Sequence, residues 1–316
     1  HYEVPLPLKE NAMFPCNRAQ ILKRFNNTVK RLENNSKLHE DYSNFMQTLI
    51  DRKFVEKIPE EDLEGDPGKC WYIPHHSVYH KQKNKIRVVF DCSLKFNGKS
   101  LNDQLLQGPD LTNNLFSVLN RFRQEPIGVT ADIEKMFFQV RVRENDRNLL
   151  RFFWFDSENQ ISEYRLLVHV FGATSSPSIA NYALRQSCID MECSSEVQSA
   201  ILKNFYVDDY LKSTGSKDQA VTLALDVRNT LSQAGFNLTS FISNNDLVLN
   251  AINDETSVSY PAGDRQITNN CNGDKRALGI VWDTHDDTLG YRVTIDNGVK
   301  ITKRNILSIL ASVYDP

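Results

Sequence analysis

Two apolar, strand-like segments of this chain end in carboxylates, and this feature constrains its fold more than any other. Residues 205–207 are apolar, Asp208 and Asp209 follow, and the apolar pattern resumes at 210–211. Removing a carboxylate from water costs several kcal/mol unless a cation compensates it. Two acids at a hairpin tip therefore suggest a site for a hard cation, and Mg²⁺ is the usual occupant where phosphates share the coordination. Asp-Asp is also common in exposed turns, so these residues alone leave both interpretations open.

A third acid, Asp132, favours the cation site. Within residues 129–133 the odd-numbered positions are apolar and should pack inward, whereas Thr130 and Asp132 should point to the other face. An apolar strand ending in an acid, together with a hairpin carrying two more, fits a two-metal phosphoryl-transfer centre with ions roughly 3.5–4 Å apart. We expect Asp132 and Asp208 to bridge both ions and Asp209 to be the outer ligand.

The composition sets broad limits. The 316 residues should form one large or two modest cores. With 40% hydrophobic and 24% charged residues and no apolar run long enough to span a bilayer, the chain is typical of soluble globular proteins. Its six cysteines form no paired CxxC motifs, which argues against zinc and favours reduced thiols. Because the chain opens at His1 without a signal peptide and stops at Asp315-Pro316, we interpret it as an excerpt of a longer polyprotein.

The net charge of −3 is low for a protein that binds nucleic acid, but the basic residues are locally concentrated. The segment 77–90 predicts a β-hairpin whose turn carries lysines, and Lys85 and Arg87 should bind a triphosphate. Two arginine clusters also occur, and for the second a solvated face and a functional role are both open. Their members are Arg121 and Arg123, and Arg141, Arg143, Arg147 and Arg151.

Hydrophobic periodicity predicts an α+β fold. Asn17 and Gln20 are a candidate cap pair for the first helix, and Asp218 and Gly235 should begin and end the last one. The predicted helices cover residues 17–34, 37–57, 111–123, 178–190 and 218–234, and the strands cover much of 71–90 and the short segments 236–242, 258–260 and 277–282.

The order of the motifs resembles one known family. The Asp132 motif (132–138), the segment 171–177 and the motif 206–209 are similar to the three catalytic motifs of reverse transcriptases from LTR retrotransposons, most closely those of Pao/BEL type. Residues 85–91 resemble the fingers motif and 278–282 the primer grip. The segments 2–7, 301–304 and 310–316 also resemble the flanks of Pao polymerases.

This resemblance implies a right-hand polymerase with fingers and palm, in which helices flank an antiparallel palm sheet. The implied divisions are N-terminal helices and fingers at 1–105, a first part of the palm at 106–142, a second part of the fingers at 143–175, the palm with catalytic hairpin and primer grip at 176–290, and the start of a thumb or connection at 291–316.

The resemblance also assigns roles to residues outside the three catalytic acids. Ile133 would join the acids in binding two Mg²⁺ ions, with Mn²⁺ as the alternative, and Gly172 would lie against the nucleotide because glycine allows close approach. Tyr206, Leu278 and Gly279 would contact primer and template.

Two positions refine the interpretation. Phe137 occupies the place of an aromatic ring that excludes a 2′-hydroxyl, although one of the two adjacent rings, Phe137 and Phe138, should instead be core. Ser240 stands where related elements carry a lysine, a candidate general acid for pyrophosphate. Either another proton donor serves, or this copy is decaying.

The sequence therefore predicts an RNA-directed DNA polymerase that adds deoxynucleotides to a primer 3′-hydroxyl on an RNA or DNA template. Its expected location is cytoplasmic, in virus-like particles, with protease, RNase H and integrase outside this chain. One alternative is a degenerate or domesticated fragment that binds nucleic acid without catalysis. Another is an RNA-dependent RNA polymerase, against which Phe137 argues.

Overall fold

The computed structural model describes residues 1–80, 85–257, 274–277, 280–291 and 302–310. Contacts divide the chain into two compact units, each built from two separate segments. The first unit contains His1–Leu111 and Lys135–Ala183, and the second contains Thr112–Glu134 and Leu184–Pro316. No helix in the described residues is long and apolar enough to cross a membrane. The fingers and palm boundaries expected from the sequence remain a prediction.

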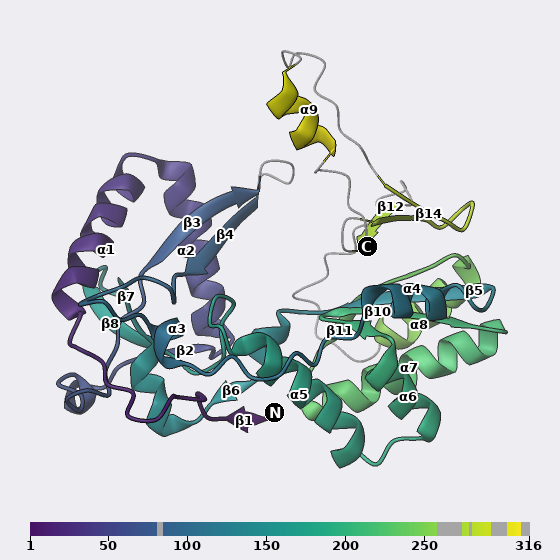
Figure 1. Cartoon of the computed structure of the whole chain (residues 1–316), viewed down its shortest axis with the longest axis horizontal. Coiled ribbons are helices and arrows are strands. Elements are labelled where there is room, and N and C mark those ends of the chain that lie inside the picture. Colours follow the sequence, from purple (N-terminus) through teal and green to yellow (C-terminus); the bar gives the residue numbers. More distant parts are fainter. Residues whose placement is uncertain (81–84, 258–273, 278–279, 292–301, 311–316) are drawn as a thin grey trace. The chain divides into compact units, whose positions relative to one another are not determined.

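The first unit packs two long helices against small sheets (Figure 1). Strands β2, β8 and β7 form an antiparallel sheet, β3 and β4 form a hairpin, and β1 pairs with β6 in parallel. The elements are β1 (Glu3–Val4), α1 (Arg18–Glu33), α2 (Ser36–Asp51), β2 (Val55–Lys57), β3 (His75–His80), β4 (Lys85–Phe90), α3 (Leu101–Gln104), β6 (Arg141–Val142), β7 (Arg151–Phe155) and β8 (Ile161–Leu166), with 3-10 turns at Glu60–Asp62, Met136–Gln139 and Glu144–Leu150.

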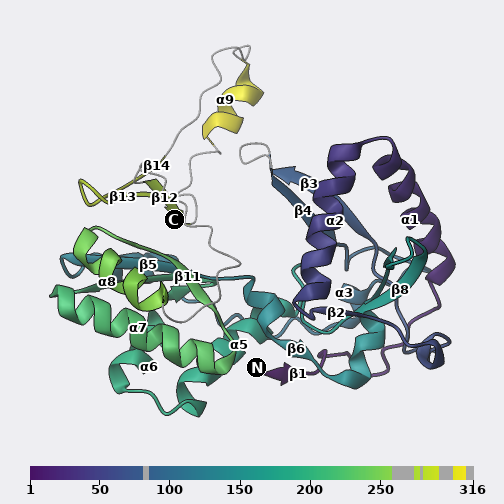
Figure 2. The same ribbon diagram turned by 180° about the vertical axis from the view of Figure 1, so that it is seen from behind.

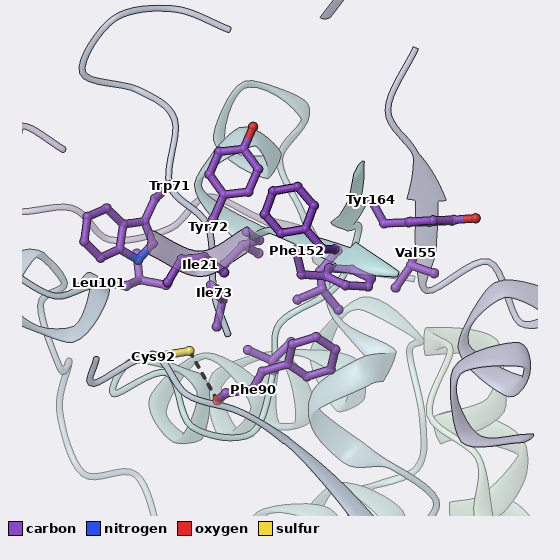
Figure 3. Packing of buried hydrophobic residues seen from close by; sticks show 14 of the residues in the cluster. Ile21, Val55, Trp71, Tyr72, Ile73, Phe90, Cys92, Leu101, Phe152 and Tyr164 are labelled. Atoms are coloured by element: carbon purple, nitrogen blue, oxygen red, sulfur yellow. Dashed lines mark hydrogen bonds between the residues drawn. The ribbon is translucent and has the colours of Figure 1, made fainter. Parts of the chain in front are cut away.

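The core of the first unit is rich in aromatic rings, several of which are drawn in Figure 3. Tyr42 of α2 stacks on Trp154 of β7 at a centroid distance of 5.2 Å, and Tyr72 stacks on Phe153 at 5.2 Å. Such contacts add about 0.5–1.5 kcal/mol each to the burial of their area. They explain why α1 and α2 dock here with their apolar faces inward.

A buried arginine completes this unit. Arg151 at the start of β7 is fully buried; its Nη1 and Nη2 donate to the backbone carbonyls of Leu63 and Asp62 at 2.9 and 2.6 Å. It also pairs with Glu163 at 3.7 Å, and Asn148 accepts from its Nε and Nη2. Arg151 is therefore neither part of a solvated face nor a functional residue, the two interpretations of its cluster, because its side chain stabilises the core.

The second unit contains an antiparallel sheet of four strands in the order β11-β5-β10-β9. Helix α7 packs against β5, β10 and β11 (Figures 1 and 2). Helix α4 contacts β9 and β10. The elements are α4 (Leu115–Phe122), β5 (Ile127–Ile133), α6 (Ser195–Lys203), β9 (Phe205–Tyr206), β10 (Asp209–Thr214), α7 (Lys217–Ala234), β11 (Leu238–Ser243), α8 (Asp246–Ser257), the sheet β12 (Asp274–Ala277), β13 (Ile280–Asp283) and β14 (Thr288–Tyr291), and α9 (Lys303–Leu310). Helix α5 (Ser176–Asp190) contributes residues to both units.

The expected elements are largely present, but several boundaries differ. Helix α2 ends at Asp51, six residues before the predicted end, because Val55–Lys57 pairs with β8 instead. Helix α4 is shorter than predicted, α5 begins two residues earlier, and α6 and α8 were not predicted. The strand predicted at 258–260 lies outside the described residues.

Two predicted helix caps are wrong. The side chain of Asn17 is buried and exchanges hydrogen bonds with the backbone of Tyr72, so it does not cap α1. Ser216 caps α7 by accepting from the backbone N–H of Gln219, while Asp218 lies in the first turn. Gly235 ends α7 as predicted, with a φ of 94° that favours glycine.

Candidate active site

The turn between β9 and β10 brings two predicted acids next to the third. Asp209 opens β10 and pairs directly with Asp132 of β5, while the backbone carbonyl of Asp208 accepts from the N–H of Ile133 at 2.9 Å. Val207 closes the turn with a φ of 54°. This conformation is rare for a β-branched residue, costs about 1–3 kcal/mol, and clusters at functional sites.

Strand β5 separates its two faces as predicted. Val129, Ala131 and Ile133 are at most 3% exposed, and α7 packs on this strand. Asp132 lies on the opposite face and is half-buried. Thr130, on the same face as Asp132, is nevertheless buried. The polar face is therefore partly covered.

The register indicates which groups share the face of Asp132. Directly paired residues project to the same side of a sheet, so Asp209 and Tyr206 lie on this face with Asp132. Their β-carbons are expected roughly 4.5–5.5 Å apart, and opposed like charges are destabilising. A cation bound between these two carboxylates would lower the repulsion between them.

The donor set fits a hard cation, because carboxylates and carbonyls are the ligands that Mg²⁺ takes. Within the described part of the chain, however, no group of three or more His, Cys, Asp or Glu side chains is gathered closely enough to hold a metal ion. The backbone therefore brings the candidate ligands together without closing a three-residue cage, and the metal ligands remain a prediction.

The remaining predicted site residues are distributed between the units. Lys85, Arg87, Phe137 and Gly172 belong to the first unit, and Tyr206 belongs with the acids to the second. The expected hairpin is present as β3 and β4, with Arg87 exposed, while its tip at 81–84 lies outside the described residues. Leu278 and Gly279 also lie outside them. The roles of all these residues remain predictions.

Phe137 and Phe138 occupy different environments. Phe138 packs against the core of the first unit, with its ring 5.4 Å from that of Phe54. Phe137 is half-buried and lies 5.8 Å from Phe171, which is 69% exposed. Phe138 thus packs on the core of the first unit, whereas the role of Phe137 as a gate remains a prediction.

Gly172 lies close to the backbone of Phe90, which leaves no space for a side chain. It has a φ of 114°, and a Cβ at this position would lie 2.8 Å from the carbonyl oxygen of Phe90. Asn102 holds the same loop through hydrogen bonds to the Gly172 carbonyl at 2.9 Å and from the Thr174 N–H at 3.0 Å. The sequence does not indicate this role of Asn102, because a side chain that binds a loop 70 residues away leaves no local pattern.

Ser240, the position where the resemblance implies a lysine, lies in an irregularity of β11. The pairing with β5 shifts between Thr239 and Ile242, and Ser240 is exposed with a φ of 57°. A β-bulge of this kind redirects side chains and is common beside active sites.

Comparison with known proteins identifies the family. A family model described as reverse transcriptase (RNA-dependent DNA polymerase) matches residues 17–240. The chain belongs to this family. No curated protein matches it. Reverse transcriptases are nucleotidyltransferases, and the fold of α-helices and antiparallel sheets is that of this family.

One solved structure supports the fold, and a second is less similar. A foamy viral protease-reverse transcriptase in complex with double-stranded DNA matches with a TM-score of 0.53 and 14% identity over 84% of this chain. A protease-reverse transcriptase of prototype foamy virus matches with a TM-score of 0.48 and 14% identity over 75%. The present chain spans 38% and 25% of these two chains.

Proposed function

We propose that this chain is the polymerase segment of a reverse transcriptase from a Pao/BEL-type LTR retrotransposon. The observation that carries the proposal is the direct pairing of Asp132 with Asp209, beside the strained turn at Val207. An assembly that places like charges opposite each other needs a functional reason, and cation binding provides one.

In this proposal Asp132, Asp208 and Asp209, with the backbone of Ile133, hold two Mg²⁺ ions, and Mn²⁺ can replace them. When bound, the cations neutralise phosphate charge and activate the attacking oxygen. The primer 3′-hydroxyl attacks the α-phosphate of a deoxynucleoside triphosphate in line, and pyrophosphate leaves. The protein mainly positions the groups, since positioning and electrostatics dominate phosphoryl transfer.

The other groups select and orient the substrates. Lys85 and Arg87 bind the triphosphate through charge-assisted hydrogen bonds. Phe137 excludes a 2′-hydroxyl, and the Gly172 loop lies against the nucleotide. Tyr206, Leu278 and Gly279 contact the primer–template, which is RNA or DNA. The rest of a polyprotein, with protease, RNase H and integrase, and the cytoplasmic virus-like particle complete the proposed context.

The test is primer extension on poly(rA)–oligo(dT), with and without Mg²⁺. We expect extension that needs Mg²⁺ and that Asp208→Asn lowers by roughly 10²–10³-fold or more, since it weakens a group acting on the transition state. Asp226→Asn on the exposed face of α7 is the matched control and should keep full activity. Extension by Asp208→Asn at the wild-type rate, in a folded protein, would overturn the metal assignment.

A second candidate is a chain that binds nucleic acid without catalysis. Ser240 favours it, because serine cannot replace lysine as a general acid. The same assay separates the two candidates. If the wild-type protein binds poly(rA)–oligo(dT) in the presence of Mg²⁺ but does not extend it, the chain is a degenerate fragment. Extension with ribonucleotides instead would indicate an RNA polymerase.

A further inference from the structure

Trp282 is the buried centre of the contact between the β13–β14 hairpin and the rest of the second unit. Trp282 of β13 is 3% exposed and meets Phe122 of α4 edge to face, with ring centroids 4.9 Å apart. Both belong to a small cluster with Val118 and Leu211. A buried aromatic pair of this kind is a specific attachment rather than a loose contact.

Gly128 of β5 provides the space for this ring. A Cβ at Gly128 would lie 3.0 and 3.1 Å from two ring carbons of Trp282 and 3.1 Å from Phe122. Gly128 is not among the glycines with positive φ, so the backbone does not require glycine here. The missing side chain is therefore explained by the close approach of Trp282.

A polar network closes over the ring. The indole N–H of Trp282 donates to Oδ1 of Asp287 at 3.0 Å. Arg123 donates to the same oxygen at 2.6 Å and to the Asp287 carbonyl at 2.9 Å. Burial opposes ionisation of Asp287, but hydrogen bonds from Arg123 and Trp282 outweigh it and lower the pKa of this carboxyl. Asp287 is thus an ionised acceptor that joins the hairpin turn to the end of α4.

The same cluster reaches the catalytic face of the sheet. Tyr206 and Ile242 pack against it. Tyr206 pairs with Asp209, while Leu211 and Ile242 pair with Thr130, which shares its face with Asp132. The hairpin anchor and the carboxylates therefore occupy one face of one sheet.

We propose that Arg123, Gly128 and Trp282 are positioning residues that hold the β13–β14 hairpin at a fixed place relative to Asp132 and Asp209. The inference rests on the proposed function, in which Leu278 and Gly279, directly before β13 in the sequence, contact the primer. A loosened anchor displaces the primer end from the acids. The binding of the incoming nucleotide, assigned to residues of the first unit, stays unchanged.

The test uses Arg123→Ala and Gly128→Ala, with Arg123→Lys as the conservative variant and Arg24→Ala on exposed α1 as the matched control. Hydrogen exchange of residues 280–291 reports the hairpin, anisotropy gives the Kd for poly(rA)–oligo(dT), and single-nucleotide addition gives kcat and the KM for dTTP. We expect faster exchange, a primer–template Kd raised roughly fivefold (about 1 kcal/mol), a lower kcat, and a KM for dTTP within about twofold of wild type. Arg123→Lys should recover part of the loss.

Faster exchange with an unchanged primer–template Kd and kcat would overturn the inference, because the anchor would then be structural only. A rise in the KM for dTTP equal to the loss of primer affinity would also overturn it. If the wild-type protein binds primer–template but does not extend it, the proposed function is refuted and the inference about the anchor is not. The hydrogen exchange and the primer–template Kd of the variants then still test the anchor. Arg123→Ala keeps the test valid if Gly128→Ala does not fold.

Discussion

The two units treat charged side chains in opposite ways. In the first, Arg151 is fully buried, with two backbone carbonyls and Asn148 as acceptors and Glu163 as its counterion. In the second, Asp132 and Asp209 pair across neighbouring strands, although both carry the same charge. The buried network in the first unit satisfies the hydrogen-bonding groups of its arginine, whereas the second unit places two acids opposite each other, an arrangement that we propose binds a cation.

The largest effect should come from breaking the buried network. Arg151→Met removes the buried donors to the backbone carbonyls of Asp62 and Leu63, while Glu163 keeps Arg18 as a counterion at 2.6 Å. Because two buried carbonyls lose their partners, we expect a loss of about 3–5 kcal/mol in the free energy of unfolding. Urea unfolding measures it. Arg143→Met, at an exposed position, should stay within about 0.5 kcal/mol. Equal effects of the two substitutions would remove the contrast between buried and exposed charge.

The first unit should also weaken in acid. Burial lowers the pKa of His75 from 6.5 to about 4, against the hydrogen bond to the Phe153 carbonyl. Between pH 6.5 and about 4, His75 binds a proton in the unfolded chain and not in the folded one. The contribution of His75 to the free energy of unfolding therefore falls as the pH decreases through this interval and is constant below it. At 1.36 kcal/mol per pKa unit the loss is on the order of 3 kcal/mol.

Urea unfolding between pH 8 and pH 4 measures this loss. The double variant His75→Phe with Tyr42→Phe is the comparison, because Tyr42 hydrogen-bonds His75 and would otherwise lose its partner. Its pH dependence over this interval should be shallower. His169, whose pKa burial also lowers to about 4, should supply part of the remaining slope. An unchanged slope in the double variant contradicts the role of His75.

Phe137 and Phe138 allow the same comparison between a residue proposed to act on the substrate and a residue that stabilises the fold. Phe137→Val should lower discrimination against ribonucleotides by roughly 10–100-fold, a loss of about 1–3 kcal/mol of selectivity, with little change in stability. Phe138→Val should do the reverse, because Phe138 packs on Phe54 in the core. Incorporation ratios of rTTP and dTTP, together with melting temperatures, separate the two. Unchanged discrimination in folded Phe137→Val would show that the ring is no gate.

The smallest effect concerns the bulge. Ser240→Lys should speed the chemical step of nucleotide addition a few-fold, a small part of the roughly 10²–10⁴-fold that general acid catalysis provides. Its stability should change by less than about 0.5 kcal/mol, because serine already carries the Cβ cost of the positive φ at this exposed position. Ser240→Asn tolerates this conformation without supplying an acid and is the control. Pre-steady-state kinetics decide, and equal rates for both variants leave Ser240 an ordinary surface residue.

The sequence by itself determined the local features. Alternation of apolar residues predicted the inward face of β5, the acid pair predicted the turn at 206–209, and Gly235 predicted the end of α7. These predictions succeed because strand alternation, turn chemistry and left-handed glycine depend on neighbours within a few residues.

Only the tertiary structure decided what depends on distant partners. Asn17 binds the backbone of Tyr72 instead of capping α1, and Arg151 is a core group, for which the sequence left a solvated face and a functional role open. Helix α2 ends at Asp51 because the last residues of the predicted helix pair with β8 as strand β2. The Trp282 anchor likewise needs Arg123 from another segment. No local pattern encodes these contacts, because their free energy comes from burying groups that meet only after the chain has folded.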